Sequence, residues 1–216
     1  SHLVDGDEAI WPDPSARPVF SWTDDTNGMK YFYVDVSTDE TFPLKDSKRT
    51  MVLGPAKPQT SSLATTAAQW KKVRKLATAG GGSLYWRVRA LDADKALVLA
   101  CGAKTLIVDA GEWTVGSIDW TALAPQVSWT CTGQGITRFR VEFSSDDAFE
   151  GGAKTVILMP VKAPGANSYA FTAGNVKRIK ALAKRNGATT LYYRVRGEDA
   201  DKAFVTYSGT EGVNTP

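Results

Sequence analysis

The sequence is poor in the side chains on which most hydrolases and metalloenzymes depend. Among 216 residues there is one histidine, His2, and there are two cysteines, Cys101 and Cys131. A chain without an internal histidine has no Ser–His or Cys–His couple and no histidine-based zinc site. The cysteines have neither metal-ligand spacing nor the number that a disulfide scaffold needs, so we expect two partly buried thiols. We therefore predict that the chain is not an enzyme and that it holds no cofactor and no metal.

The sequence also lacks long hydrophobic runs and a strong charge of either sign. No apolar stretch approaches the roughly 18 residues of a membrane span, so we expect no membrane insertion. The 26 basic and 23 acidic side chains leave a net charge of +3, too small for a strong electrostatic footprint on nucleic acid. The hydrophobic content of 43% is that of a folded globular protein. We expect no nucleic-acid partner and a monomeric chain.

What the sequence does contain is an internal repeat. Residues 84–98 read LYWRVRALDADKALV, and residues 191–205 read LYYRVRGEDADKAFV. Eleven of these 15 positions are identical, and the offset of 107 residues recurs elsewhere along the chain. Such a repeat indicates two copies of one folding unit. We place the units at residues 1–112 and 113–216, each large enough to bury a core of its own.

Alternation of apolar and polar side chains predicts β-strands in both units. The clearest segment, residues 138–143, reads RFRVEF, which places its apolar side chains on one face and its charged ones on the other. Residues 31–36 and 84–90 alternate in the same way. Further strands are expected at residues 19–23, 50–53 and 96–100, with copies at residues 127–131, 155–159 and 203–207.

One stretch in each unit has the period of a helix instead. Thr66 and Gln69 have the spacing of a capping box, and Gly80-Gly81-Gly82 stops the pattern that follows. The copy begins at Thr172 and stops at Asn186-Gly187. The apolar faces of the two helices consist of Trp70, Val73, Leu76 and Ala77, and of Val176, Ile179, Leu182 and Ala183. Their solvated faces are expected to carry Lys71, Lys72, Arg74 and Lys75, and Lys177, Arg178 and Lys180.

About five to seven short strands and one helix per unit favour two packed layers. The pattern resembles the fibronectin type III family, in the form common in bacterial multidomain proteins. The resemblance is carried by Trp22 and Trp129 on the second strands, by an aromatic-x-Val third strand, and by the YWRVR and YYRVR sixth strands. It implies a mainly β chain of two tandem immunoglobulin-like (fibronectin type III-like) β-sandwiches, each with one short amphipathic helix inserted before the sixth strand.

The sequence departs from the family pattern at two points. Leu84 and Leu191 stand where a tyrosine usually opens the sixth strand, and the helix replaces a short loop. Another immunoglobulin-like sandwich, or an α+β repeat, is the alternative fold.

The resemblance implies a non-catalytic tandem structural or interaction module, a spacer or protein-binding platform of a larger secreted or surface protein. The alternative is a carbohydrate- or polyanion-binding accessory module of a polysaccharide-active enzyme. The expected partner is a protein or a glycan, and secretion follows from the resemblance alone.

A candidate ligand face lies on the outward sides of the third and sixth strands of the second unit, which are neighbours in such a sandwich. Its residues are Arg138, Arg140, Arg194, Arg196 and Tyr192. The simpler interpretation is a cross-strand ladder of arginine–carboxylate and arginine–aromatic contacts, each worth roughly 0.2–1 kcal/mol. The functional hypothesis is a docking face for an acidic partner or an anionic glycan, because arginine binds carboxylates and phosphates bidentately.

Acidic turns raise the question of calcium in the first unit. Asp24, Asp25 and Asn27 follow the second strand, and Asp92 and Asp94 follow the sixth. Oxygen-bearing side chains of this kind are calcium ligands. The corresponding first turn of the second unit has no acidic residue, so we interpret these side chains as caps of their own backbone.

Overall fold

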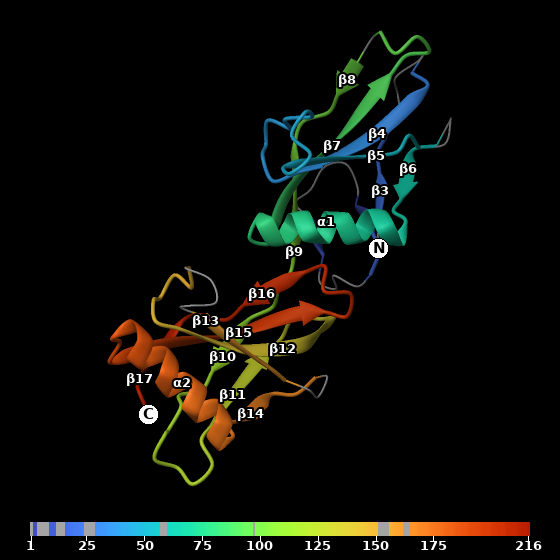
Figure 1. The fold of residues 1–216 in the computed structure, drawn as a ribbon. Helices are drawn as coiled ribbons and strands as arrows, with labels where there is room; N and C mark the ends of the chain where they lie inside the picture. Colours follow the sequence, from blue (N-terminus) through green and yellow to red (C-terminus); the bar gives the residue numbers. More distant parts are fainter. Residues whose placement is uncertain are drawn as a thin grey trace. The chain divides into compact units, whose positions relative to one another are not determined.

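A computed structural model describes residues 2–3, 9–11, 16–23, 29–56, 60–96, 98–150, 156–161 and 165–216. Within these residues the protein is mainly β, with two helices and several open sheets. The chain divides into two compact units, Ser1–Ala110 and Gly111–Pro216 (Figure 1). The division falls two residues before the boundary that we placed from the repeat.

The described residues of unit 1 form two sheets and one helix. Its elements are β1 (His2–Leu3), β2 (Ala9–Trp11), β3 (Val19–Ser21), β4 (Tyr31–Ser37), β5 (Thr50–Leu53), β6 (Ser62–Ala64), α1 (Ala67–Ala79), β7 (Ser83–Leu91), β8 (Val98–Ala100) and β9 (Lys104–Val108). The smaller sheet has the strand order β1-β3-β6. The larger has the order β2-β9-β7-β4-β5, and β8 also pairs with β7, so β5 is an edge strand.

Unit 2 repeats most of this arrangement, but it has no counterpart of β2 among its described residues, and β10 pairs with β11 antiparallel whereas β1 pairs with β3 in parallel. Its elements are β10 (Trp113–Val115), β11 (Gln126–Cys131), β12 (Ile136–Ser144), β13 (Val156–Pro160), β14 (Ser168–Ala170), α2 (Ala173–Asn186), β15 (Thr190–Asp199), β16 (Val205–Tyr207) and β17 (Glu211–Asn214). The smaller sheet has the order β10-β11-β14 and the larger β13-β12-β15-β16, with β17 also paired to β15. The central pair of each larger sheet has the same register, since Asp35 faces Arg87 and Glu142 faces Arg194.

Aromatic side chains join the two sheets within each unit. The ring centroids of Trp22 and Phe32 are 5.6 Å apart, and those of Trp129 and Phe139, their counterparts 107 residues later, are 5.5 Å apart. Both tryptophans are buried, as the sequence predicts. The inward positions of the central strands are buried too, namely Phe32, Val34, Val36, Leu84, Trp86, Val88, Ala90, Phe139, Val141 and Phe143. Each unit is therefore a two-layered, sandwich-like β structure with one helix attached.

Both helices begin and end where the sequence predicts. The hydroxyl of Thr66 accepts a hydrogen bond from the backbone N–H of Gln69, whose side-chain oxygen accepts one from the N–H of Thr66. Thr172 and Asn175 form the same capping box at the start of α2. Gly187 ends α2 in the left-handed conformation at φ 64°, which glycine adopts without a steric penalty.

One helix residue contradicts the expected solvated face. Arg74 is only 4% exposed, whereas Lys71, Lys72 and Lys75 are exposed as predicted. Arg74 follows the buried Trp70 by four residues, so the two side chains lie on the same face of α1. Position on the helix, rather than charge, decided its burial.

Several short strands were not predicted from the sequence: β1, β2, β6, β9, β10, β14 and β17. Segments this short contain too few positions to show alternation, and they form because longer neighbours offer hydrogen-bonding edges. The sequence predicts each helix directly before the sixth strand of its unit. In unit 2, α2 does precede the sixth described strand, β15. In unit 1, α1 precedes the seventh described strand, β7, because both β1 and β2 precede β3.

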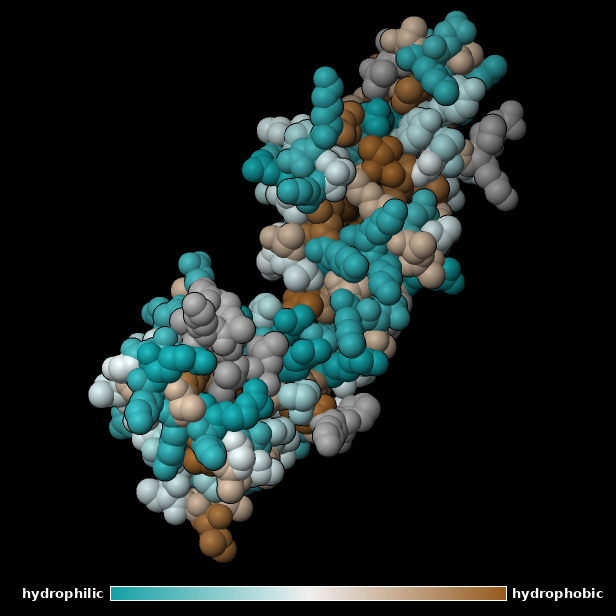
Figure 2. Space-filling model, in the orientation of Figure 1, coloured by the Kyte–Doolittle hydropathy of each residue, from teal (hydrophilic) through white to brown (hydrophobic). Residues whose placement is uncertain are grey.

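The remaining observations concern the two cysteines, the length of the helices and the surface. Neither cysteine is in a disulfide; both thiols are partly buried, and the Sγ of Cys101 accepts a hydrogen bond from Val88 N at 3.0 Å. Within the described ranges, no helix is long and apolar enough to cross a membrane. Figure 2 shows hydrophilic residues over most of the visible face, with apolar residues in small separate patches.

Candidate functional site

The outward faces of β12 and β15 bring the candidate arginines beside two carboxylates. Arg194 Nε donates a hydrogen bond to Glu142 Oε2 at 2.9 Å, and Arg196 Nη2 lies 2.8 Å from Glu198 Oε1. Arg140 Nε lies 3.5 Å from the same Glu198 oxygen. The two glutamates are only 3% and 2% exposed, although they lie on the outward face of the sheet. A buried carboxylate requires such partners, so these contacts are structural.

Aromatic rings complete the environment of Arg194. Its guanidinium carbon lies 4.0 Å from the ring centroid of Phe149 and 4.0 Å from that of Tyr207. Tyr192, by contrast, faces Ser144 across the strand pair and is half-buried. Arg194 is thus engaged in intramolecular contacts on several sides.

The same ladder occurs in unit 1. Asp35 is fully buried and is contacted by Arg87 Nε at 3.1 Å and by Arg89 Nε at 2.6 Å. The guanidinium of Arg87 lies 4.3 Å from the ring centroid of Phe42. The acid, the first arginine and the phenylalanine each lie 107 residues before their counterparts in unit 2. A feature present in both copies belongs to the shared scaffold and does not by itself indicate a ligand.

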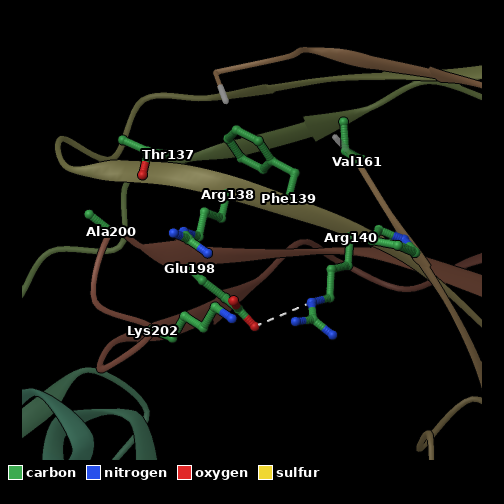
Figure 3. Close-up of a pocket in the computed structure, with 9 residues that line it drawn as sticks. Thr137, Arg138, Phe139, Arg140, Val161, Glu198, Ala200 and Lys202 are labelled. Carbon is green, nitrogen blue, oxygen red and sulfur yellow. Dashed lines mark ion pairs between the residues drawn. The ribbon is translucent and has the colours of Figure 1, made fainter. Parts of the chain in front are cut away.

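A groove of about 380 Å³ lies beside the ladder of unit 2. We call it the Arg138 groove; its charged lining residues are Arg138, Arg140, Glu198 and Lys202. Figure 3 shows the three cationic side chains around Glu198, with the ion pair between Arg140 and Glu198 drawn as a dashed line. The groove combines the end of the β12–β15 strand pair with the turn that follows β15.

The Arg138 groove has more positive than negative charge. The one carboxylate among its described lining residues, Glu198, is already shared between Arg140 and Arg196. Arg138 and Lys202 are both exposed, and neither has a carboxylate of a described residue within 4.0 Å. Among the described residues, these two cations therefore have no neutralising partner at the edge of the groove.

Comparison with unit 1 shows that this surplus of positive charge is specific to unit 2. In unit 1 the Nζ of Lys95 lies 5.1 Å from the ring centroid of Tyr31, which is a cation–π contact. At the equivalent positions, 107 residues later, unit 2 has Lys202 and Arg138. The two turns match in conformation, with φ 59° at Lys95 and φ 55° at Lys202. An attractive pair in one copy is thus replaced by two like charges in the other.

Only some of the residues predicted for the candidate face line the Arg138 groove. Arg138 and Arg140 line the groove, whereas Arg194, Arg196 and Tyr192 do not. Sequence reasoning did not select Glu198 and Lys202 for this face. Lys202 carried a usable signal, because it lies in the repeated Asp-Ala-Asp-Lys turn that directly follows the sixth strand.

The acidic turns act as backbone caps where the structure describes them. Asp92 Oδ1 accepts a hydrogen bond from Ala96 N at 2.8 Å, and Asp199 Oδ1 accepts one from Ala203 N at 2.7 Å. Residues 24–28, which include the three oxygen-bearing side chains of the first turn, lie outside the described residues. In the part that is described, no three histidine, cysteine or acidic side chains gather as metal ligands would.

Comparison with known proteins does not assign the chain to a family. No family model matches it, and no curated protein does. Among solved structures it is similar to a DUF3823 family protein from Bacteroides ovatus, with a TM-score of 0.32 and 10% identity over 94% of this chain and 100% of that one. A DUF3823 family protein from Parabacteroides merdae gives a TM-score of 0.31, with 11% identity and the same coverage.

A further similarity is to an enzyme. The alpha-L-rhamnosidase of Dictyoglumus thermophilum gives a TM-score of 0.32 and 11% identity, covering 96% of this chain but 28% of that one. TM-scores this low do not establish a common fold, so no function is carried over from any of these proteins.

Proposed function

We propose that this chain is a non-catalytic pair of fibronectin type III-like modules and that unit 2 binds an anionic partner in the Arg138 groove. In unit 2, the first, second and fifth described strands form one sheet, and the third, fourth, sixth, seventh and eighth form the other. This division supports an immunoglobulin-like sandwich. The buried glutamates of the ladder, Glu142 and Glu198, are each held by arginine, an arrangement unlike a catalytic acid–base pair. We place the modules in a larger secreted or surface protein, which rests on the family resemblance.

The observation that carries the binding proposal is the pair Arg138 and Lys202. Like charges at neighbouring exposed positions repel each other, and the scaffold does not need both of them, since unit 1 keeps the lysine but has a tyrosine at the first position. A bound carboxylate or sulfate group turns this repulsion into attraction, with arginine offering a bidentate fork and lysine a point charge. The proposed ligand is a polymer that carries such groups, either an anionic glycan or an acidic polypeptide.

The test compares two variants that lose the same charge. Arg138→Ala with Lys202→Ala removes the two cations of the groove. Lys177→Ala with Arg178→Ala removes two exposed cations of α2 and serves as the control. Binding to heparin, hyaluronan and polyglutamate is measured by titration calorimetry at fixed salt.

We expect the groove variant to lose at least about tenfold in affinity for one of these polymers, since two charge-assisted hydrogen bonds are lost. We expect the control variant to change that affinity by less than about twofold. Comparison of the three polymers identifies the source of the anion, because hyaluronan carries only carboxylates and polyglutamate is a polypeptide. Equal losses in both variants, or binding to none of the polymers, would overturn the proposal in favour of a simple spacer.

A further inference from the structure

A second groove, of about 650 Å³, lies in unit 1 between the edge strand β5 and the helix α1. We call it the β5–α1 groove; Figure 1 shows the two elements that form its walls. Three consecutive residues of β5, Thr50, Met51 and Val52, line one wall. Lys72, Lys75, Leu76 and Ala79, which share one face of α1, line the other. This groove is separate from the site of the proposed function, which lies in unit 2.

The apolar part of the groove is left open to solvent. Leu44 and Val52 are 44% and 43% exposed, among the most exposed large hydrophobic side chains of the described residues. Leu76 lies beside them and is nearly buried. Covering apolar surface stabilises a complex by about 25 cal/mol per Å², so a partner that supplies an apolar side chain here is favoured.

The charged part of the groove has a single sign. Lys48, Lys72 and Lys75 line it, all three are exposed, and no aspartate or glutamate is among its described lining residues. None of the three ammonium groups forms an ion pair with a described residue. The complementary partner therefore carries carboxylates on either side of its apolar side chain.

The shape of the groove favours an extended chain over a helix. Successive side chains of a strand point to opposite faces, so a groove lined by three consecutive residues of β5 follows the edge of that strand. An edge strand presents backbone N–H and C=O groups to which a further strand can pair.

We propose that the β5–α1 groove binds an extended, acidic segment of a partner protein, which adds a strand beside β5. Its central apolar side chain contacts Leu44 and Val52, and its flanking carboxylates pair with the three lysines. The affinity depends on all three elements of the groove: the edge of the strand, the apolar floor and the lysine rim.

The test uses a fluorescent peptide of alternating glutamate and valine, followed by fluorescence anisotropy on the full chain. Lys75→Glu reverses one charge of the rim. Lys71→Glu is the matched control, since Lys71 is exposed on the same helix and does not line the groove. Val52→Thr removes apolar surface and keeps a β-branched residue in the strand.

We expect Lys75→Glu to weaken binding by at least about tenfold, Val52→Thr to weaken it measurably, and Lys71→Glu to change it by less than about twofold. The same peptide with N-methylated backbone amides should bind far less well, because it cannot pair with β5. Equal effects of the two lysine variants, undiminished binding of the N-methylated peptide, or no binding at millimolar peptide would overturn the proposal.

The two proposals fail separately. The variant Arg138→Ala with Lys202→Ala should bind the peptide as the unchanged chain does, because its substitutions lie in the other unit. Loss of peptide binding in that variant would contradict the placement of the peptide in the β5–α1 groove, whatever the outcome of the polymer titrations.

Discussion

Arg89 forms two hydrogen bonds with Asp35, in which its Nε donates to Oδ2 at 2.6 Å and its Nη2 donates to Oδ1 at 2.9 Å. Arg87 donates to the same Oδ2 at 3.1 Å. The carboxylate is fully buried, so its charge is compensated by protein groups and not by water. Removing one member of such a cluster leaves the others without compensation.

We therefore predict that Asp35→Ala destabilises unit 1 by about 3 kcal/mol, because two arginines lose their shared partner. Unfolding in urea, followed by circular dichroism, measures the change. The control is Glu40→Ala, which replaces an exposed acidic residue and should change the free energy of unfolding by less than about 0.5 kcal/mol. Similar effects of the two substitutions would contradict a structural role for the ladder.

The core tryptophans test whether the two units fold independently. Trp129→Ala should cost about 3–5 kcal/mol, because it removes a buried ring that packs on Phe139. Calorimetry should show one of two unfolding transitions moving to lower temperature while the other stays. Trp22→Ala should move the other transition. If either substitution lowers both transitions together, the units unfold cooperatively and the prediction is wrong.

A glycine of β15 is required by close packing. A Cβ atom added to Gly197 would lie 2.7 Å from Ile136 Cγ2 and 2.8 Å from Trp113 Cζ2. Gly197→Ala should therefore cost about 1–3 kcal/mol, as overpacked cores do. Gly209→Ala is the control, since nothing lies within 4 Å of its added Cβ. A destabilisation by Gly209→Ala as large as that by Gly197→Ala would argue against this packing explanation.

Unit 2 should lose stability at alkaline pH through Tyr193. Burial, with a smaller contribution from the negative charge of Glu211, raises the pKa of its hydroxyl to about 12. In the unfolded chain the pKa is about 10, so between pH 10 and pH 12 the folded state retains a proton that the unfolded state releases. The protonated Tyr193 therefore contributes fully to the free energy of unfolding below pH 10. This contribution falls as the pH rises from 10 to 12, by on the order of 2 kcal/mol in all.

The measurement is the free energy of unfolding against pH for the unchanged chain and for Tyr193→Phe. The substitution removes the ionisable hydroxyl and its 2.9 Å hydrogen bond to the carbonyl oxygen of Gly116, so it should cost about 1 kcal/mol at neutral pH. The variant should lose less stability than the unchanged chain between pH 10 and pH 12. Parallel pH curves for the two proteins would show that Tyr193 does not cause the alkaline loss.

Sequence reasoning was most successful where structure depends on local pattern. The capping box at Thr66, the glycine stop after α2 and the alternation of residues 138–143 each involve neighbours within a few positions, and all were found in the structure. The strand at Thr50–Leu53 was predicted to the residue. The short strands were missed because their existence depends on a neighbouring edge.

The candidate site was predicted only in part, because its chemistry depends on contacts between strands. From the sequence, Arg138 and Arg194 are equivalent outward-facing cations. In the folded unit, Arg194 is held by Glu142 and two aromatic rings, whereas Arg138 has no such partner among the described residues.

By itself, the sequence determined that the chain is a duplication, where its helices begin and end, and which faces of its longer strands are apolar. These properties follow from covalent order and from the periods of helix and strand. Only the tertiary structure decided that Asp35, Glu142 and Arg74 are buried and that Lys202 stands beside Arg138 in one groove. The burial and pairing of a charge depend on side chains distant in sequence, which come together only when the sheets form.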